Sequence, residues 1–470
     1  MPEQRKWVWR LGLHLLLGLA LAYWRPLSTW WGAGAFFYFL LQTLRSRNRT
    51  GMAHLGAAYI VGLEVLLRMT KAALFWEFGK LACITLLVVG LLVEGRRHYR
   101  WGYLSIAVLL LPALFLGTEV DFSRFRQHIT FQLGGMILLS LSCVYFAARR
   151  MGVAELQQLF RYSLWPIGAM VAYLFAVTPQ LAQIEFTFSA NFAASGGYGP
   201  NQVSTILGWG MLLLAVNFLL RWPPLFSRFW DIALLVALAF RALLTFSRGG
   251  VLGFFVAIFV AYTIYLLSNR QTNRRYLLVR WGLVMGTIVL LFAMVNQLTG
   301  ELLIHRFRGE TMAVYVGDAA YSLDKATSGR SRVIQTDWQM WLDHPVWGVG
   351  VGMSNVLRPQ YGYANISHLE QTRLLAEHGL LGIWVLLLLV GAMVWRTVSG
   401  APISKFMVLA FSLFSFLTMF HSATRLAVVG FAFGLGLVHV YANYSLSRQS
   451  PFEGRGVSFG GRKPGALAGA

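Results

Sequence analysis

The stretch GVLGFFVAIFVAYTIYLLS, residues 250–268, indicates the fold class of this chain, because it is long, apolar and without a charged side chain. A helix of about 20 apolar residues crosses the roughly 30 Å hydrocarbon core of a bilayer. Comparable runs recur along the whole chain, and 57% of its 470 residues are hydrophobic while 12% are charged. We expect membrane spans at residues 11–24, 30–44, 52–69, 79–95, 101–118, 129–148, 162–178, 203–220, 230–246, 250–268, 278–297, 379–396, 403–420 and 424–445.

These runs predict an all-α polytopic membrane protein, since helices satisfy their own backbone hydrogen bonds inside lipid. Because the first two runs are short, we expect about 12–14 transmembrane helices. The chain then divides into a helix bundle at 1–297, a long loop with the catalytic residues at 298–378, further transmembrane helices at 379–446, and a disordered tail at 447–470.

The positions of lysine and arginine predict the orientation in the membrane. Basic turns near residues 5–10, 45–49, 96–100, 149–161, 221–228, 270–280, 396–405 and 448–463 alternate with poorer ones and hold more than half of the 40 basic residues. Basic turns stay in the cytoplasm, so both termini should lie there and the 298–378 loop should lie outside. The formal net charge of +22 then faces membrane lipids at the cytoplasmic rim, and no nucleic-acid partner is expected.

The 298–378 loop contains a candidate general base, His368. Ser367 and Glu370 have the spacing of a capping box, which predicts a helix with His368 as its first helical residue. The positive end of the helix dipole would keep this imidazole neutral and able to accept a proton. The alternative is a histidine that only helps to cap the helix.

Arginines near predicted helix ends are candidate ligands of a phosphate or pyrophosphate. Arg241 and Arg248 are seven residues apart, which predicts one shared helix face, and Gly249 and Gly250 follow with exposed backbone N–H groups. A guanidinium binds phosphate well in such a place. The alternative for Arg248 is an arginine that reaches to lipid phosphates at a helix end.

A second pair, Arg330 and Arg332, opens an amphipathic stretch that extends to Leu342 and carries Trp338 and Trp341 at helical spacing. The pattern is typical of an interfacial helix at the membrane surface, and its arginines could hold phosphate in a bidentate manner. Pro345 should end this helix. The glycines that follow, at 348, 350 and 352, allow the backbone to approach another group closely.

Arg68 and Lys71 lie one helical turn apart and could meet an anionic headgroup. Mutual ion pairs with the nearby Glu64, Glu77 and Lys80 explain them equally well. Two further features favour structural roles. Asp231 is expected to form a surface ion pair with Arg228, and Pro200 is well placed as the first residue of a helix.

The sequence offers no pattern for a metal site, because DxD, HExxH and CxxC are all missing, and Cys83 and Cys143 fall inside predicted spans. The loop serines have no partnered base at a recognisable spacing, so a nucleophilic triad is not supported either. What remains is a set of arginines and one histidine. This combination suits glycosyl transfer from a lipid pyrophosphate, where the leaving group needs only charge stabilisation.

Four blocks between residues 246 and 382 resemble the O-antigen ligase and O-antigen polymerase superfamily. They are Phe246-Ser247-Arg248-Gly249-Gly250, Ser328-Gly329-Arg330 with Trp338, His344-Pro345 with Gly348-Val349-Gly350 and Gly352, and His368 with Glu377 and Gly379. The chain looks most like the ligase. It departs from the family at Leu369, where the family often has Asn, so any function of that Asn does not carry over to this chain.

The resemblance implies a GT-C-like inverting glycosyltransferase that needs no metal or other cofactor. It would move O-antigen from undecaprenyl pyrophosphate to lipid A–core at the outer face of the bacterial inner membrane. His368 would be the base, Arg248 and Arg330 the pyrophosphate clamp, and Arg332, Arg241, Arg68 and Lys71 weaker candidates. The alternatives are an O-antigen polymerase, a protein O-oligosaccharyltransferase or a non-catalytic transporter of lipid-linked glycan.

Overall fold

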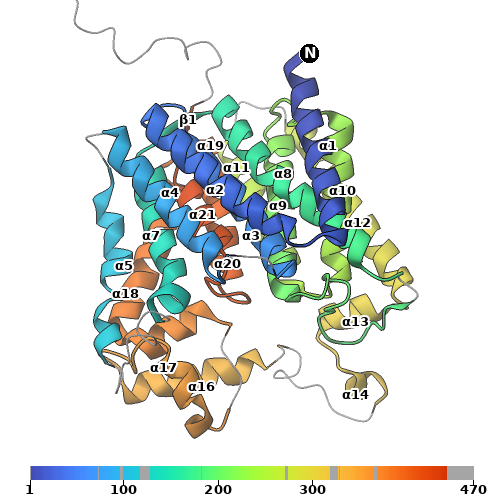
Figure 1. Ribbon diagram of the computed structural model, residues 1–470. Helices are drawn as coiled ribbons and strands as arrows, with labels where there is room; N and C mark the ends of the chain where they lie inside the picture. The colour runs from blue at the N-terminus through green and yellow to red at the C-terminus, as the bar shows by residue number, and fades with distance from the viewer. Residues whose placement is uncertain are drawn as a thin grey trace, which may run out of the picture.

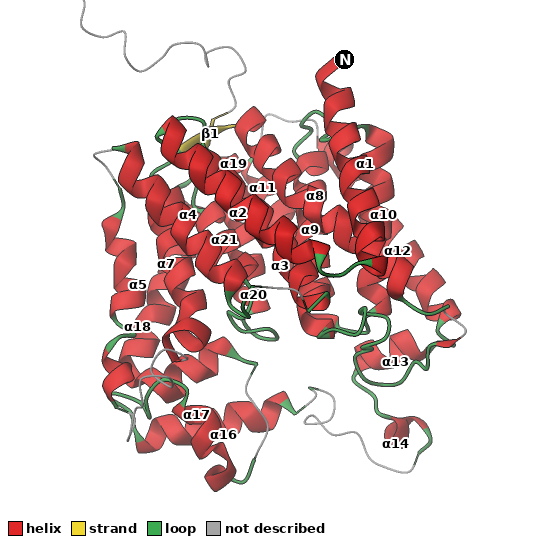
Figure 2. Ribbon diagram, viewed as in Figure 1, coloured by secondary structure: helices red, strands yellow, loops and turns green. Residues whose placement is uncertain are grey.

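The computed structural model describes residues 2–71, 74–95, 99–116, 128–180, 183–269, 274–317, 327, 329–363 and 368–441, and most of these residues are helical (Figure 2). The predicted tail at 447–470 and the serines at 328 and 367 lie outside the described residues. The elements are α1 Pro2–Tyr23, α2 Leu27–Ser46, α3 Met52–Met69, α4 Phe78–Glu94, η1 Trp101–Leu104, α5 Ser105–Val108, η2 Pro112–Phe115, η3 His128–Leu133, α7 Gly134–Ala147, β1 Arg150–Gly152, α8 Val153–Val177, α9 Pro200–Leu219, α10 Arg228–Leu244, α11 Arg248–Ser268, α12 Arg274–Leu298, α13 Leu302–Arg308, α14 Met312–Tyr315, α16 Arg330–Asp343, α17 Met353–Leu357, η5 Arg358–Tyr361, α18 Glu370–Ser399, α19 Pro402–Met407, η6 Val408–Ser412, α20 Leu413–Thr418, α21 Ala427–Gly436 and β2 His439–Tyr441.

The long helices form a bundle, as the prediction of an all-α polytopic membrane protein requires (Figure 1). Among the described residues, 7 helices are both long and apolar enough to cross a membrane, fewer than the expected 12–14. They are Met52–Met69, Ile129–Ala147, Val153–Val177, Pro200–Leu219, Arg248–Ser268, Leu277–Leu298 and Glu370–Ser399. The long helices α1, α2, α4 and α10 run beside them (Figure 1).

Two predicted spans are wrong as continuous helices. The run at 101–118 forms only short helices, because Pro112 cannot donate a backbone N–H and starts a new turn, η2. The run at 424–445 contains the 10-residue α21 and then strand β2. β2 pairs in parallel with β1, so the fold also has a small two-stranded ladder that was not predicted.

Burial separates central helices from lipid-facing ones. In the apolar window of α3, 94% of residues are buried, whereas only 22% are buried in the corresponding window of α12. Glycines allow the central helices to touch. A Cβ on Gly208 of α9 would lie 2.6 Å from the carbonyl oxygen of Gly250 in α11. Small residues at such crossings permit close backbone packing of helices in membranes.

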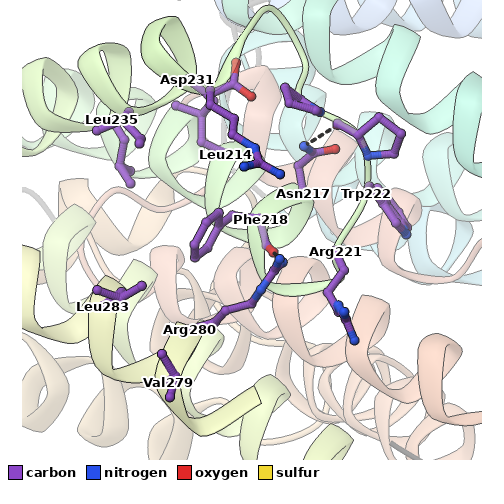
Figure 3. Close-up of a pocket in the computed structure, with 14 residues that line it drawn as sticks. Leu214, Asn217, Phe218, Arg221, Trp222, Asp231, Leu235, Val279, Arg280 and Leu283 are labelled. Carbon is purple, nitrogen blue, oxygen red and sulfur yellow. Dashed lines mark hydrogen bonds between the residues drawn. The ribbon is translucent and has the colours of Figure 1, made fainter. Parts of the chain in front are cut away.

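The basic turns that the structure describes lie at one end of the bundle, which is uppermost in Figure 1 and carries the N-terminus and β1. Here Arg396 of α18 donates to the carbonyl oxygen of Leu437, and its Nη1 lies 3.3 Å from Nδ1 of His439. His439 in turn donates its backbone N–H to Arg149. A cavity of about 520 Å³ opens at this end between α9, α10 and α12 (Figure 3). We call this end the basic end.

Short helices of the 298–378 loop cover the opposite end (Figure 1). The predicted amphipathic helix is confirmed as α16, which stops at Asp343, two residues before Pro345. Its buried face, with Val333 and Met340, packs on α18. The Arg358–Asp337 ion pair, with both side chains fully buried, ties η5 to α16. Trp338, by contrast, is 49% exposed on the other face of the helix.

Candidate functional site

Three helices begin close together at the end covered by the 298–378 loop. Arg248 is the first residue of α11, Arg330 is the first residue of α16, and His368 precedes the first residue of α18 by two positions. Arg330 is close enough to Arg248, and to His421 in the turn after α20, for these side chains to interact electrostatically. Because helix N-termini attract anions, this convergence forms a candidate anion site.

Arg248 and Arg241 do not share one helix face, which corrects the prediction. α10 ends at Leu244 and α11 begins at Arg248, with Phe246 in the left-handed region (φ 53°) between them. Arg241 is buried and donates to Thr178 Oγ1 at 2.5 Å and to the carbonyl oxygen of Ala194 at 2.6 Å. It therefore anchors the 178–199 segment, while Arg248 lies at the convergence of the helix ends.

The two glycines after Arg248 have packing roles that the sequence did not reveal. A Cβ on Gly249 would lie 2.1 Å from the imidazole ring of His421. A Cβ on Gly250 would lie 2.2 Å from the carbonyl oxygen of Ser204 in α9. The glycine pair thus lets the N-terminus of α11 fit between α9 and His421, which sets the position of Arg248.

Arg330 is positioned by the glycine before it. Gly329 has a φ of +78°, and a Cβ there would lie 2.2 Å from the hydroxyl oxygen of Tyr363. Both observations favour glycine at this position. Burial lowers the pKa of Arg330, and the nearby charge of Arg248 lowers it further.

A third arginine, Arg306 of α13, belongs to the same cluster and was missed by sequence reasoning. It donates through Nη1 to the carbonyl oxygen of Phe188 at 2.9 Å and through Nε to that of Phe246 at 3.3 Å. Burial, and then repulsion by Arg248 and Arg330, lowers its pKa to about 10. Arg248, Arg306 and Arg330 are called the arginine cluster below. No spacing rule would have joined residues so far apart in the chain.

His368 is held against the turn that connects α20 to α21. Its carbonyl oxygen accepts the backbone N–H of Ala423 at 3.1 Å, and Glu370 donates its own N–H to the carbonyl of Met419 at 2.9 Å. The expectation that His368 is the first helical residue is wrong, because α18 starts at Glu370 after the extended Leu369. The backbone bonds to the turn, rather than a place inside the helix, position the imidazole.

His421, in that same turn, is a second histidine of the site that sequence reasoning missed. Its Nε2 lies 3.0 Å from Thr205 Oγ1, and its backbone carbonyl is 3.5 Å from Asn201 Nδ2. Burial lowers the pKa of His421 to about 3, and the charge of Arg330 adds to this effect, with a smaller contribution from His368. His421 is therefore neutral and lies beside both the arginine cluster and His368.

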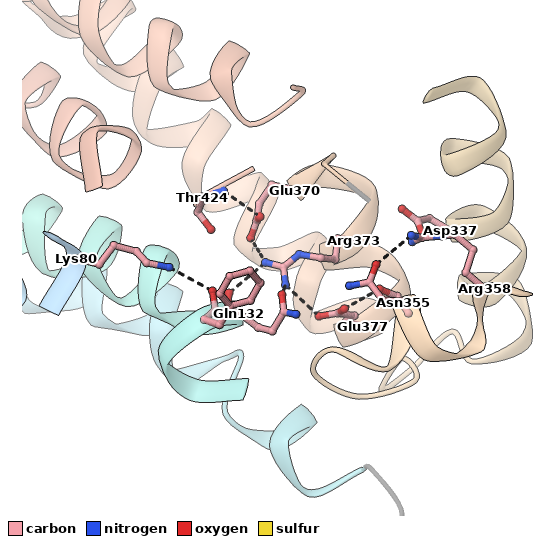
Figure 4. Close-up of polar contacts among 11 residues, drawn as sticks. Lys80, Gln132, Asp337, Asn355, Arg358, Glu370, Arg373, Glu377 and Thr424 are labelled. Carbon is pink, nitrogen blue, oxygen red and sulfur yellow. Dashed lines mark hydrogen bonds and ion pairs between the residues drawn. The ribbon is translucent and has the colours of Figure 1, made fainter. Parts of the chain in front are cut away.

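A buried polar network fixes the start of α18 (Figure 4). Arg373 Nη2 binds Glu370 Oε1 at 2.5 Å and the carbonyl oxygen of Gln132 at 3.1 Å, and its Nη1 lies 3.4 Å from Glu377 Oε2. The other oxygen of Glu370 accepts the backbone N–H of Thr424 at 3.2 Å. Charges buried in this way need such partners. The network joins η3, α18 and the turn that contains His421.

The glycine-rich 348–352 segment approaches another backbone closely, as predicted, and its partner is a kink in α18. Gly348 has a φ of +73°, and a Cβ there would lie 2.4 Å from the carbonyl carbon of Glu377. Gly350 donates its N–H to the carbonyl of Glu377 at 3.1 Å. At the kink Gly379 has φ 56° and ψ −132°, so the third and fourth sequence blocks form one interlocked unit.

The other predicted anion ligands lie in different surroundings. Arg68 is buried, pairs with Glu64 at 2.8 Å and donates to Gln202 Oε1 at 3.1 Å. Lys71 is exposed beyond the end of α3, and Arg332 is exposed on α16. The Lys80–Glu77 pair, at 2.5 Å, fits the ion-pair interpretation of that segment.

Two structural expectations have different outcomes. Asp231 does not form the expected pair with Arg228. Its carboxylate instead accepts the backbone N–H groups of Leu225 and Phe226, at 2.8 and 3.0 Å, because it lies at the positive end of α10. Pro200 is, as predicted, in the first turn of α9.

Comparison with known proteins assigns part of the chain to a family. No curated protein matches the sequence. No solved structure matches it either. A family model described as O-antigen ligase matches residues 232–395, which include Arg248, the arginine cluster and His368. This match confirms the resemblance drawn from the four sequence blocks, and residues 232–395 are thus similar to the O-antigen ligase family.

Proposed function

We propose that this protein is an O-antigen ligase, a glycosyltransferase that moves O-antigen from undecaprenyl pyrophosphate to a hydroxyl of lipid A–core. One observation carries the proposal within the family: Arg248 and Arg330 begin two helices, Arg306 lies near both, and His421 lies near Arg330 and His368. Such a site combines strong binding of an anion with a group that can accept a proton.

The arginine cluster suits a pyrophosphate. Burial and mutual repulsion lower the pKa values of Arg306 and Arg330, so the positive charges carry an electrostatic cost that a bound polyanion would relieve. Guanidinium groups also bind phosphate oxygens in a bidentate manner. Arg248, Arg330 and Arg306 therefore form the proposed clamp. Glu64 compensates the charge of Arg68, and Arg241 anchors Thr178 and Ala194 without an electrostatic contribution from the cluster, so we assign both arginines structural roles. Lys71 and Arg332 are exposed and would act only on the outer parts of the donor.

In the proposed reaction His368 is the general base. It removes the proton of the acceptor hydroxyl as that oxygen attacks the anomeric carbon from the face opposite the leaving group. The new glycosidic C–O bond forms while the bond from the anomeric carbon to the pyrophosphate oxygen breaks, which inverts the configuration. The arginine cluster stabilises the charge that develops on the departing pyrophosphate. In this scheme no metal ion takes part.

The proposed setting is the bacterial inner membrane, with the site facing the periplasm and both termini in the cytoplasm. The basic turns that the structure describes support this orientation because they lie at the end of the bundle opposite to α16 and α17 of the 298–378 segment. The 298–378 segment would then be the periplasmic loop between the helices at 1–297 and 379–446.

The test uses purified protein in detergent with lipid-linked O-antigen, with and without lipid A–core and a metal chelator, analysed by gel. A shifted lipopolysaccharide band that requires lipid A–core and survives chelation is the expected result. Longer glycans on the carrier, formed without lipid A–core, would instead identify a polymerase. Glycan on a Ser or Thr of an added protein would identify a protein O-oligosaccharyltransferase. A folded protein that binds the donor and gives no product would indicate a transporter.

A further inference from the structure

The cavity at the basic end has no part in the proposed reaction, because none of its lining residues belongs to the candidate site, and α16 and α17 of the 298–378 segment lie at the other end of the bundle (Figure 1). Its volume of about 520 Å³ is within the roughly 300–1,000 Å³ of typical ligand pockets. Figure 3 shows its walls, which come from the end of α9, the start of α10 and the adjoining part of α12.

The polar wall is strongly basic. Arg221, Arg228 and Arg280 line it, against a single acid, Asp231. The Asp231 carboxylate is directed to the backbone N–H groups of Leu225 and Phe226. Arg280 is held in place by donating to the carbonyl oxygen of Phe218 at 2.7 Å. The cavity therefore has an excess of two positive charges before any ligand is counted.

The apolar wall faces away from the protein. Ile232 is 56% exposed, Val279 62% and Leu283 58%, and all three line the cavity. Val279 and Leu283 lie on α12, which is long and apolar enough to span a membrane, so their exposed side chains belong in contact with lipid tails, and Ile232 of α10 lines the same cavity. The cavity thus joins a cluster of arginines to a surface that acyl chains cover.

We propose that this cavity binds an anionic phospholipid of the adjacent leaflet. The headgroup phosphate would lie between Arg221, Arg228 and Arg280, and the acyl chains would lie along Ile232, Val279 and Leu283. Arginines bind phosphate oxygens well, and a basic residue near an anionic membrane surface strengthens binding roughly fivefold. A free phosphate ion would contact the arginines but would leave the apolar wall uncovered.

The experiment is native mass spectrometry of the full-length protein in detergent, titrated with phosphatidylglycerol, phosphatidylcholine or inorganic phosphate. Wild-type protein should retain phosphatidylglycerol in preference to phosphatidylcholine. The triple variant Arg221→Gln, Arg228→Gln, Arg280→Gln should bind phosphatidylglycerol at least about tenfold more weakly. The matched control removes three exposed arginines at another corner of the same end, Arg45→Gln, Arg47→Gln and Arg49→Gln, and should retain wild-type affinity.

A single variant protects the test against misfolding. Arg228→Gln changes one exposed side chain and should weaken phosphatidylglycerol binding roughly fivefold. The proposal is overturned if the cavity variants bind phosphatidylglycerol as tightly as the control variant does. It is also overturned if inorganic phosphate displaces the lipid at equal concentration, because phosphate alone would then be the ligand.

Discussion

Arginines gather at both ends of the bundle, but their surroundings differ. In the arginine cluster near His368, Arg306 and Arg330 are partly buried and repel Arg248, and this repulsion contributes to their lowered pKa values. At the basic end Arg221 and Arg228 are exposed to solvent and border an apolar, lipid-facing wall. A crowded, partly buried cluster favours a compact polyanion, whereas exposed arginines beside apolar side chains favour an amphiphile.

The two ends of the bundle are also built differently. The site end is assembled from the starts of α11, α16 and α18. The 419–424 turn holds the start of α18 through backbone hydrogen bonds and packs against Gly249 of α11. Small positional errors in such a site are costly, because catalysis depends on distances of a few ångströms. At the basic end Arg221 and Arg228 are exposed to solvent, so a change there should perturb the protein less.

The largest effect should come from His368→Ala. Loss of a general base lowers turnover by roughly 10²–10⁴-fold, and the gel assay with lipid A–core would measure it. The thermal midpoint should stay near that of wild type, because the backbone bonds of residue 368 to the turn do not need the side chain. A folded variant with turnover within threefold of wild type would show that His368 is not the base.

The next largest effect should be on stability, in Arg358→Met. Asp337 would be left fully buried without its cation, and breaking such a pair costs about 3–5 kcal/mol. The thermal midpoint in detergent should fall clearly, and α16 with Arg330 should loosen. Replacing both partners, Arg358→Met with Asp337→Leu, should recover part of the loss. Arg45→Met, exposed at the basic end, is the control and should change the unfolding free energy by less than about 0.5 kcal/mol.

Local sequence patterns predicted much of the architecture. Pro200 starts α9, α16 ends before Pro345, and the 348–352 glycines approach another backbone, because each feature depends on nearby residues. The break between α10 and α11 was also predicted, because the apolar runs at 230–246 and 250–268 are separate, but the left-handed conformation of Phe246 within it was not. The fit of Gly249 and Gly250 against His421 and α9 depends on tertiary packing and has no short-range signature.

The site was predicted only in part for the same reason. His368, Arg248 and Arg330 stand in recognisable blocks, whereas Arg306 and His421 reach the site through the packing of α13 and the 419–424 turn. Arg241 and Arg68 looked similar to Arg248 in sequence, but Arg241 is bound to Thr178 and Arg68 to Glu64, whereas the charge of Arg248 acts on Arg306 and Arg330. An arginine in a membrane segment therefore cannot be assigned to a substrate from spacing alone.

A third experiment sharpens the distinction between an arginine of the cluster and its neighbour on the surface. Arg306→Lys and Arg248→Lys keep the charge but remove the planar fork. A charged hydrogen bond contributes about 1.5–3 kcal/mol, so turnover should fall roughly tenfold to a hundredfold. Arg308→Lys, exposed on the same helix as Arg306, should leave the rate unchanged. Equal rates in all three variants would contradict the clamp.

The smallest effect, and the most direct comparison of the two ends, is the pH dependence of stability. His421 has a pKa of about 3 in the folded protein, whereas an unfolded histidine titrates near 6.5. Below about pH 6.5 the unfolded chain therefore binds a proton that the folded chain does not. The free energy of unfolding should then decrease by roughly 1.4 kcal/mol for each unit by which the pH is lowered. Above that pH the histidine is neutral in both states and contributes no slope.

His421→Gln isolates this contribution. Between pH 7 and pH 5 the thermal midpoint of wild type should fall more than that of the variant, which lacks the titrating imidazole. At the basic end, burial also lowers the pKa of His439, with Arg396 adding to the effect, but this side chain stays partly exposed. His439→Gln should therefore change the slope less. If both variants altered the slope equally, the pKa of His421 would be lowered no more than that of His439. The greater burial of His421 would then not affect the pH dependence of stability.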